Sequence, residues 1–240
     1  MIINHGLNEY IISIDIAKKE DRTVIAIGQK ANEFTGDGRV TSFLNVLDMQ
    51  MIEHLSYPDL ARYIKRLDLN ADLHGNNDLL VDSTGVGEAV CDLLEDIGLS
   101  PERIIFTGGD TSRISGQKNA AGFITRMQTN VPKHELVDTL QMCLQERRIR
   151  LAEGIPFEQD IRKQFSHFVG VMSKSKNMIY NNDSDDVHDD IVCAMAMMAW
   201  HFMQSDGARK DFLFEPELAE DKSISLSWSE SVDYDFDSSI

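Results

Sequence analysis

The strongest constraint on the fold is a stretch of ten residues, 191–200, in which every side chain is apolar. Asp189 and Asp190 precede this stretch, and acidic residues are favoured where a helix begins. A helix that is apolar on every face has to be buried on every face. The stretch is also only half of the roughly 20 residues that a membrane-spanning helix requires. We therefore expect a helix at 187–204 in the centre of a globular domain, without a membrane span.

The rest of the chain has the element order of a mixed α/β domain. Residues 10–16 and 23–28 are rich in β-branched side chains and predict a hairpin, followed by a third strand within 40–55. The apolar pattern predicts further strands at 78–82, 102–107 and 148–152, helices at 57–69, 88–97, 132–147 and 157–165, a loop or ribbon at 108–130 and a hairpin at 168–180. This order predicts a mixed central sheet, made of a three-strand antiparallel meander plus parallel strands and flanked by helices.

The composition fits one globular domain with an acidic end. Of the 240 residues, 42% are apolar and 26% are charged, which are ordinary fractions. The three cysteines lack the spacing of metal ligands, which favours a reducing compartment over a disulfide framework or a zinc finger. We expect one domain over 1–208. Residues 209–240 hold three basic and nine acidic residues and predict a flexible acidic tail. The N-terminal residues predict no signal peptide.

Acidic residues stand where the apolar pattern predicts other types. Asp15 interrupts the first strand, and Asp82 ends the strand at 78–82. If the first and fourth strands are neighbours, these two residues lie roughly 5 Å apart across the sheet. The apolar helix then supplies a third acid. We favour Asp190 for this position, with Asp189 as a second or alternate ligand, and Asp21 in the first hairpin loop can reach an outer position.

Such a group of carboxylates predicts a metal site. Buried carboxylates repel one another, and leaving them unpaired costs several kcal/mol per ion. Oxygen ligands suit Mg²⁺ or Mn²⁺, and two such ions roughly 3.5–4 Å apart promote in-line displacement at phosphorus. The predicted catalytic residues are Asp15, Asp82 and Asp190, and the predicted metal ligands are these three with Asp21 and Asp189. Each acid also has a structural explanation: an ion pair for Asp15, a turn for Asp82 and a helix start for the last pair.

The net charge bears on nucleic-acid binding. The chain has 23 basic and 40 acidic residues, a net charge of -17, which argues against a protein that coats nucleic acid by charge alone. Residues 109–150, however, hold seven Lys or Arg residues and four acidic ones. A locally basic stretch can still hold a phosphate backbone, so the overall charge does not exclude DNA as a partner.

Five segments occur in an order and spacing typical of one family. They are ISIDIAKKEDRTVIAIG, LLVDSTGVGEAVCDLL, IIFTGGD, VPKHELVDTLQMCLQERRIRLAEG and HDDIVCAMAMMAW. Over about residues 10–204 the chain thereby resembles the nuclease domain of the large terminase subunit of tailed bacteriophages, which has a ribonuclease H-like fold. The resemblance implies a two-metal-ion endonuclease that cuts concatemeric double-stranded viral DNA during genome packaging, in the host cell cytoplasm.

The resemblance also implies site residues and partners. Asp15, Asp82, Asp189 and Asp190 would bind two Mg²⁺ or Mn²⁺ ions, and Asp21 matches a position where such domains often carry an extra acid. Four basic residues would lie near DNA: Arg113, Lys118, Arg126 and Lys133. The chain has no GxxxxGK[ST] phosphate loop, so we expect the ATPase motor outside this chain, removed or encoded separately. The portal and the small terminase subunit are further expected partners.

Three other interpretations stay open at this point. A junction-resolving endonuclease of the same fold would share the acids. An actin-like or sugar-kinase-type nucleotide-binding protein would use the glycine-rich turn Ser83-Thr-Gly-Val-Gly87 for phosphate, but it would need a small residue where Ile16 and Ala17 follow Asp15. A non-catalytic binding module would use the acidic tail for docking.

Overall fold

The computed structural model describes residues 9–16, 22–34, 40–73, 75–118, 124–172, 178–182 and 188–204. The predicted metal ligand Asp21 and the predicted tail at 209–240 lie outside the described residues.

The described residues form ten strands and five α-helices. The strands are β1 (Tyr10–Asp15), β2 (Thr23–Phe34), β3 (Val40–Ile52), β4 (Asn77–Asp82), β5 (Glu102–Thr107), β6 (Arg113–Lys118), β7 (Ile124–Pro132), β8 (Ile149–Leu151), β9 (Phe168–Met172) and β10 (Met178–Asn182). The helices are α1 (Tyr57–Asp68), α2 (Gly87–Asp96), α3 (Lys133–Gln145), α4 (Glu158–His167) and α5 (Asp190–Gln204), with a short 3₁₀ helix at Ala71–Leu73. Strand β2 continues to Phe34, past the end predicted for it at residue 28, and the other bounds lie close to the expectations.

Eight of the strands form one mixed sheet, as predicted. Its order is β6-β7-β5-β4-β1-β2-β3-β8, and β9 and β10 form a separate pair. Strands β1, β2 and β3 are an antiparallel meander, whereas β4, β5 and β7 continue parallel to β1. The ribbon expected at 108–130 is the antiparallel pair β6 and β7. The first strand therefore has β4 as its parallel neighbour, which is the arrangement that brings Asp15 towards Asp82.

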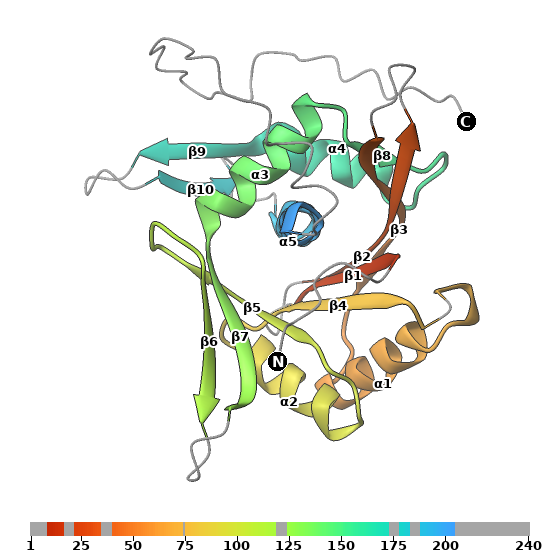
Figure 1. Ribbon diagram of the computed structural model, residues 1–240, viewed down its shortest axis with the longest axis vertical. Coiled ribbons are helices and arrows are strands. Elements are labelled where there is room, and N and C mark those ends of the chain that lie inside the picture. Colours follow the sequence, from red (N-terminus) through yellow and green to blue (C-terminus); the bar gives the residue numbers. More distant parts are fainter. Residues whose placement is uncertain are drawn as a thin grey trace.

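Helices cover both faces of this sheet (Figure 1). Helices α1 and α2 lie on one face, and α3, α4 and α5 lie on the other. The alternation of side chains along a strand supplies both cores: Ile12 and Ile14 of β1 belong to the core under α1 and α2, and Ile11 belongs to the core around α5. The middle of the sheet is thus a central layer that is buried on both sides.

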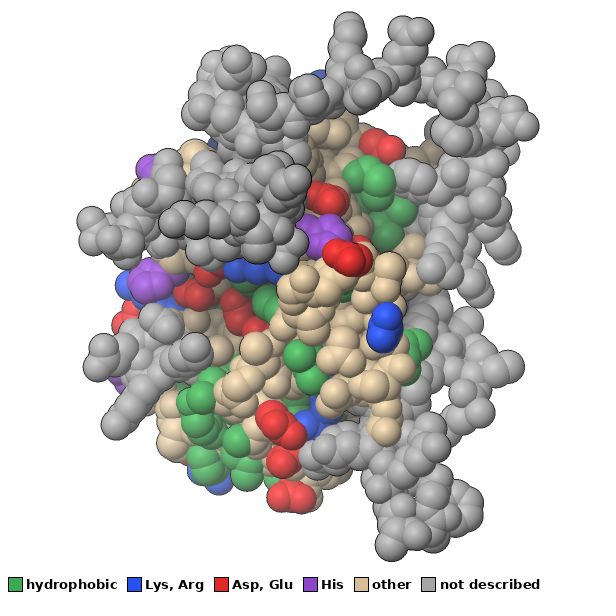
Figure 2. Space-filling view, turned by 90° about the vertical axis from the view of Figure 1, so that its left-hand side faces the viewer, with side chains coloured by type: hydrophobic (Ala, Val, Ile, Leu, Met, Phe, Trp, Pro, Cys, Tyr) green, Lys and Arg blue, Asp and Glu red, His purple; other side chains and the backbone are tan. Residues whose placement is uncertain are grey.

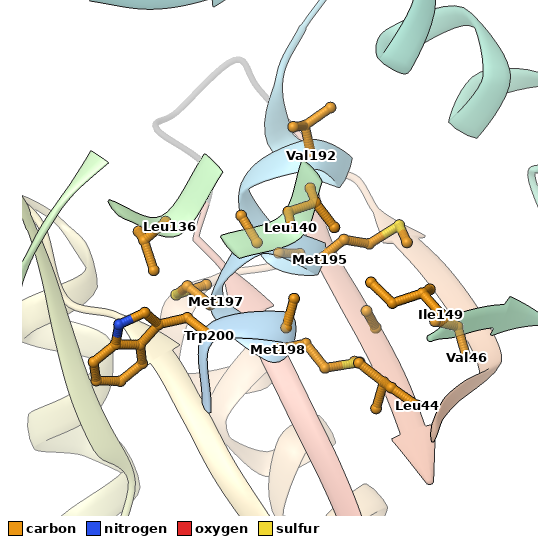
Figure 3. Packing of buried hydrophobic residues seen from close by; sticks show 14 of the residues in the cluster. Leu44, Val46, Leu136, Leu140, Ile149, Val192, Met195, Met197, Met198 and Trp200 are labelled. Carbon is orange, nitrogen blue, oxygen red and sulfur yellow. The ribbon is translucent and has the colours of Figure 1, made fainter. Parts of the chain in front are cut away.

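Helix α5 is enclosed as the apolar stretch requires. It packs against β1 and β2 on one side and against α3 and α4 on the other. Figure 3 shows Leu136 and Leu140 of α3 on one side of α5 and Leu44 of β3 on another. Gly28 of β2 allows the helix to approach the sheet, because a Cβ atom there would lie 2.5 Å from the sulfur of Met198. No helix in the described ranges is long and apolar enough to cross a membrane.

Two polar contacts fix where α5 begins and how it lies along the sheet. The helix begins at Asp190, three residues later than predicted. The side-chain oxygen of Gln164 in α4 accepts the backbone N–H of Ile191 at 2.9 Å, which satisfies one of the free donors of a helix start. Further along, Ser13 Oγ of β1 donates to the carbonyl of Ala194 at 2.8 Å. The strand that carries Asp15 is thereby bonded directly to the helix that carries Asp190.

Candidate functional site

Three of the predicted acids meet at one edge of the sheet. Asp15 is the last residue of β1 and Asp82 is the last residue of β4. The parallel pairing of these strands reaches Ile14 opposite Val81, so the two aspartates follow side by side. Asp190 is the first residue of α5, and its negative charge acts on Asp15. The strand pairing and the helix start therefore bring together residues that are up to 175 positions apart.

The turn after β4 holds Asp82 in place. The backbone N–H of Thr84 donates to Asp82 Oδ1 at 2.8 Å. Gly87 then begins α2 directly against the end of the strand, and a Cβ atom there would lie 1.8 Å from the carbonyl oxygen of Asp82. Because that neighbour is backbone, no other residue fits without moving Asp82. Close packing of this kind explains a glycine in the turn without any bound phosphate.

The charges of the neighbouring acids act on the pKa of Asp15. Burial raises the pKa of Asp15 well above its usual value, and the charges of Asp82, Asp190 and Asp189 raise it further, while Lys133 lowers it. Burial also raises the pKa of Asp82, against hydrogen bonds from Thr84 and Asp15 that lower it. The negative charges around Asp15 therefore repel one another, and Lys133 offsets part of that repulsion.

Lys133 lies inside this cluster rather than on an open surface. Its Nζ atom is 2.7 Å from Asp189 Oδ2, and 29% of each side chain is exposed. The same ammonium group is 5.9 Å from the centre of the Phe168 ring. Asp189 immediately precedes α5, and its carbonyl accepts the N–H of Cys193 at 2.8 Å. The predicted DNA contact of Lys133 stays a prediction, and its observed partner is an acid of the cluster.

The donor set fits a hard divalent cation in its chemistry. Asp15, Asp82 and Asp190 offer carboxylate oxygens, the ligands that Mg²⁺ and Mn²⁺ prefer, and their mutual repulsion is what a cation relieves. In the part of the chain that the structure describes, no three His, Cys, Asp or Glu side chains already stand in the arrangement of a metal site. The carboxylates of this cluster would have to turn towards the ion as it binds.

The other predicted DNA-binding residues belong to the ribbon of β6 and β7. Arg113 begins β6 and is exposed. Lys118 ends β6 and Arg126 lies in β7, although their side chains are not among those described. On the face drawn in Figure 2, the described Lys and Arg side chains lie apart from one another among acidic ones and form no continuous basic surface. Contact between these residues and DNA stays a prediction.

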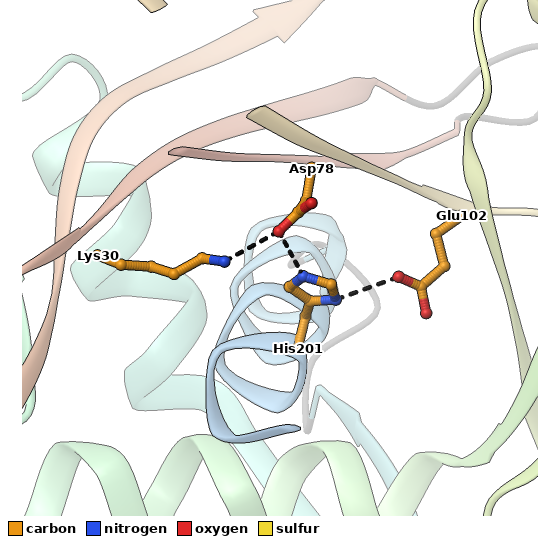
Figure 4. Close-up of polar contacts among 4 residues, drawn as sticks. All are labelled: Lys30, Asp78, Glu102 and His201. Carbon is orange, nitrogen blue, oxygen red and sulfur yellow. Dashed lines mark hydrogen bonds and ion pairs between the residues drawn. The ribbon is translucent and has the colours of Figure 1, made fainter. Parts of the chain in front are cut away.

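A second group of charged side chains lies at the other end of α5, and the sequence analysis did not anticipate it (Figure 4). Asp78 Oδ2 is 2.9 Å from both Lys30 Nζ and His201 Nε2, and His201 Nδ1 is 3.1 Å from Glu102 Oε2. Burial alone would raise the pKa of Asp78, but hydrogen bonds and charges of His201 and Lys30 lower it to about 2. Burial lowers the pKa of His201, and its two carboxylate partners outweigh that effect and raise it. We call these four residues the neutralised network.

Sequence reasoning missed two residues that position the acids. Gln164 is buried and holds the start of α5 next to Asp190, and Thr84 holds Asp82. A glutamine within an amphipathic helix carries no signal of such a contact, because its partner is 27 residues away. The threonine belongs to the turn that was considered as a phosphate cradle, and its role becomes visible only when the turn is seen to fold back on Asp82.

Comparisons with known proteins agree with this architecture. No family model matches the chain, and no curated protein is similar to it in sequence. Among solved structures, the large terminase nuclease from the thermophilic phage G20c matches with a TM-score of 0.51 and 16% identity, covering 79% of this chain and 80% of that one. The same nuclease with bound magnesium matches with a TM-score of 0.53 and 17% identity, covering 83% and 82%. The nuclease domain of g2p, the large terminase of bacteriophage SPP1, matches over 82% and 86% with a TM-score of 0.42 and 11% identity. The match to the G20c nuclease therefore agrees with the ribonuclease H-like fold that the sequence motifs predicted.

Proposed function

We propose that the protein is a metal-dependent endonuclease that hydrolyses phosphodiester bonds of double-stranded DNA and cuts concatemeric viral DNA during genome packaging. The observation that carries the proposal is the meeting of Asp15, Asp82 and Asp190 at the carboxyl edge of β1 and β4, where their charges oppose one another. Carboxylates in such an arrangement are stabilised by divalent cations. The fold shared with a nuclease that has been determined with bound magnesium supports the same assignment.

The residues of the site would either bind metal or hold the metal ligands in place. Asp15, Asp82 and Asp190 would hold two Mg²⁺ or Mn²⁺ ions, with Asp189 and Asp21 as the further acids available. When bound, two such ions activate a water molecule and stabilise the oxygen that leaves phosphorus. Thr84 keeps one oxygen of Asp82 fixed through its backbone N–H, and Gln164 keeps the start of α5 fixed through Ile191.

Partners would bring DNA to the site more efficiently than this chain does alone. A net charge of -17 opposes unaided binding to a polyanion. We infer that an ATPase motor, on a separate domain or subunit, presents the double-stranded DNA, with the portal and the small terminase subunit as further components in the host cytoplasm. Arg113, Lys118, Arg126 and Lys133 are the residues we propose to lie near the DNA.

A plasmid assay tests the proposal. Supercoiled plasmid is incubated with the wild type in Mn²⁺, Mg²⁺ or EDTA, and with Asp82→Asn and Asp190→Asn. Asp96→Asn is the matched control, because Asp96 is an exposed acid of α2. We expect nicking and linearisation that need the metal, vanish in both site variants and persist in the control.

Two outcomes contradict the proposal. Cutting that persists in both site variants would place the activity elsewhere, and a folded wild type that neither cuts nor binds Mn²⁺ would make the acids structural. A four-way junction run beside a linear duplex of the same sequence distinguishes a junction-resolving enzyme, which would cut the junction in preference.

A further inference from the structure

Lys133 occupies a position that helix stability does not explain. It is the first residue of α3 and follows Pro132, the last residue of β7. A cation at the first turn of a helix is opposed by the helix dipole. Since β7 runs parallel to β5, and β5 to β4, Lys133 emerges at the same edge of the sheet as Asp82. Its place is therefore set by the acids at that edge.

The contacts of Lys133 are those of a cation built into the cluster. Nζ lies 2.7 Å from Asp189 Oδ2, a distance typical of a charge-assisted hydrogen bond. Burial lowers the pKa of Lys133, but Cys193, Asp189 and Asp15 raise it more, so the ammonium form is retained. The positive charge also acts on Asp15 and Asp82. The Lys133 ammonium group thus offsets part of the negative charge of Asp189, Asp15 and Asp82.

We propose that Lys133 is a positioning residue that engages Asp189 and competes with the second divalent cation for the cluster, leaving Asp190 as the metal ligand that α5 supplies first. The proposal rests on the metal-dependent function proposed above. It predicts unequal binding of two cations: the first is held by Asp15, Asp82 and Asp190, and the second binds only when the ammonium leaves Asp189.

The test uses Mn²⁺ alone as the probe, without DNA. Electron paramagnetic resonance titrations count the bound Mn²⁺ ions in the wild type, Lys133→Met, Lys133→Arg, Asp189→Asn and Asp190→Asn. In the wild type we expect one tight and one weak site. Lys133→Met should bind the second ion about tenfold more tightly or better, since a competing charge is removed from within a few ångströms. Lys133→Arg, which keeps the charge, should behave as the wild type.

The two aspartate variants test the assignment within the pair. Asp189→Asn should keep the tight site within about twofold in affinity, and Asp190→Asn should weaken it about 100-fold or more, as expected for loss of a charged ligand. Equal Mn²⁺ affinities in the wild type and Lys133→Met, or a tight site lost in Asp189→Asn, overturn the inference and leave the nuclease proposal intact. A folded wild type that binds no Mn²⁺ overturns both. Thermal melts of every variant show which of them are folded.

Discussion

The two ends of α5 carry carboxylates in opposite electrostatic situations. At its C-terminal end, in the neutralised network, Asp78 lies 2.9 Å from Lys30 and from His201, and Glu102 lies 3.1 Å from His201. At its N-terminal end, burial and the charges of Asp82, Asp190 and Asp189 raise the pKa of Asp15, and the charge of Lys133 lowers it. Both groups lie between the same sheet and the same helix. The two ends show that burial raises the pKa of both carboxylates and that the charges of their neighbours then set the direction of the final shift.

The pKa values express the same contrast. Burial acts on Asp78 and Asp15 in the same direction, but the pKa of Asp78 falls to about 2 because of its cationic partners, and that of Asp15 rises well above the usual value. At the C-terminal end the cations of Lys30 and His201 stabilise the carboxylate of Asp78. At the N-terminal end Lys133 offsets part of the repulsion among the acids, and a divalent cation would relieve more of it.

The largest effect is expected from Asp15→Asn. Nuclease activity should fall about 10³-fold or more, since metal ions contribute several kcal/mol to stabilising the transition state. The melting temperature of the metal-free protein should rise, because a repelling charge is removed. Plasmid cleavage and thermal melts in EDTA measure the two changes. A lower melting temperature in EDTA would show that the acids at this end do not repel one another, contrary to the contrast between the two ends of α5.

Asp78→Asn should have the opposite pattern. It leaves Lys30 and His201 without their shared carboxylate in a buried setting, which costs on the order of 3 kcal/mol of unfolding free energy. Cleavage at a temperature where the variant is folded should match the wild type, because Asp78 lies at the opposite end of β4 from Asp82. Denaturant unfolding gives the first quantity. An unchanged unfolding midpoint would mean that the network contributes no stability.

The pH dependence of stability reports on Asp78 and His201 separately. The pKa of Asp78 is lowered from 3.8 to about 2, so its contribution is complete above pH 4 and is lost as the pH falls towards 2, by about 2 kcal/mol in all. The pKa of His201 is raised from 6.5, so its contribution is complete below that value and is lost as the pH rises through the higher folded pKa. Unfolding free energies between pH 2 and 9 should show both losses in the wild type, and a smaller acid loss in Asp78→Asn. Equal acid losses in the two proteins would assign the effect to other groups.

The smallest effect is expected from Gly28→Ala. The new methyl group would meet the sulfur of Met198 at 2.5 Å, and a flexible side chain can move aside at a cost of about 1 kcal/mol. Because α5 keeps its bonds to Ser13 and Gln164, cleavage should stay within about twofold of the wild type. Melting curves and initial cleavage rates check both statements. A large loss of cleavage with a small loss of stability would show that the site depends on the distance between α5 and the sheet.

Much of this architecture could be predicted from the sequence, for reasons that are local. The β-branched residues of β1 and β2 and the apolar stretch of α5 specify their elements directly, and the pairing of β1 with β4 places Asp15 beside Asp82. The contacts that could not be predicted join distant segments. Lys133 and Asp189 are 56 positions apart, and His201 and Asp78 are 123 apart. The sequence does not show which residue each of these side chains will contact, and only the folded chain brings the partners together. The expectations for Asp21 and the acidic tail stay predictions.

The bond from Ser13 to Ala194 bears on how far such a protein can diverge. Ser13 lies two residues before Asp15 on the same face of β1, and Ala194 lies about one helical turn after Asp190. This hydroxyl thus ties the helix to the strand close to the two acids. The surrounding core is rich in methionine, such as Met195, Met197 and Met198, whose unbranched side chains tolerate exchange. Exchanges among these methionines should therefore leave the acids in place, so that the interior can diverge while the cluster of acids stays.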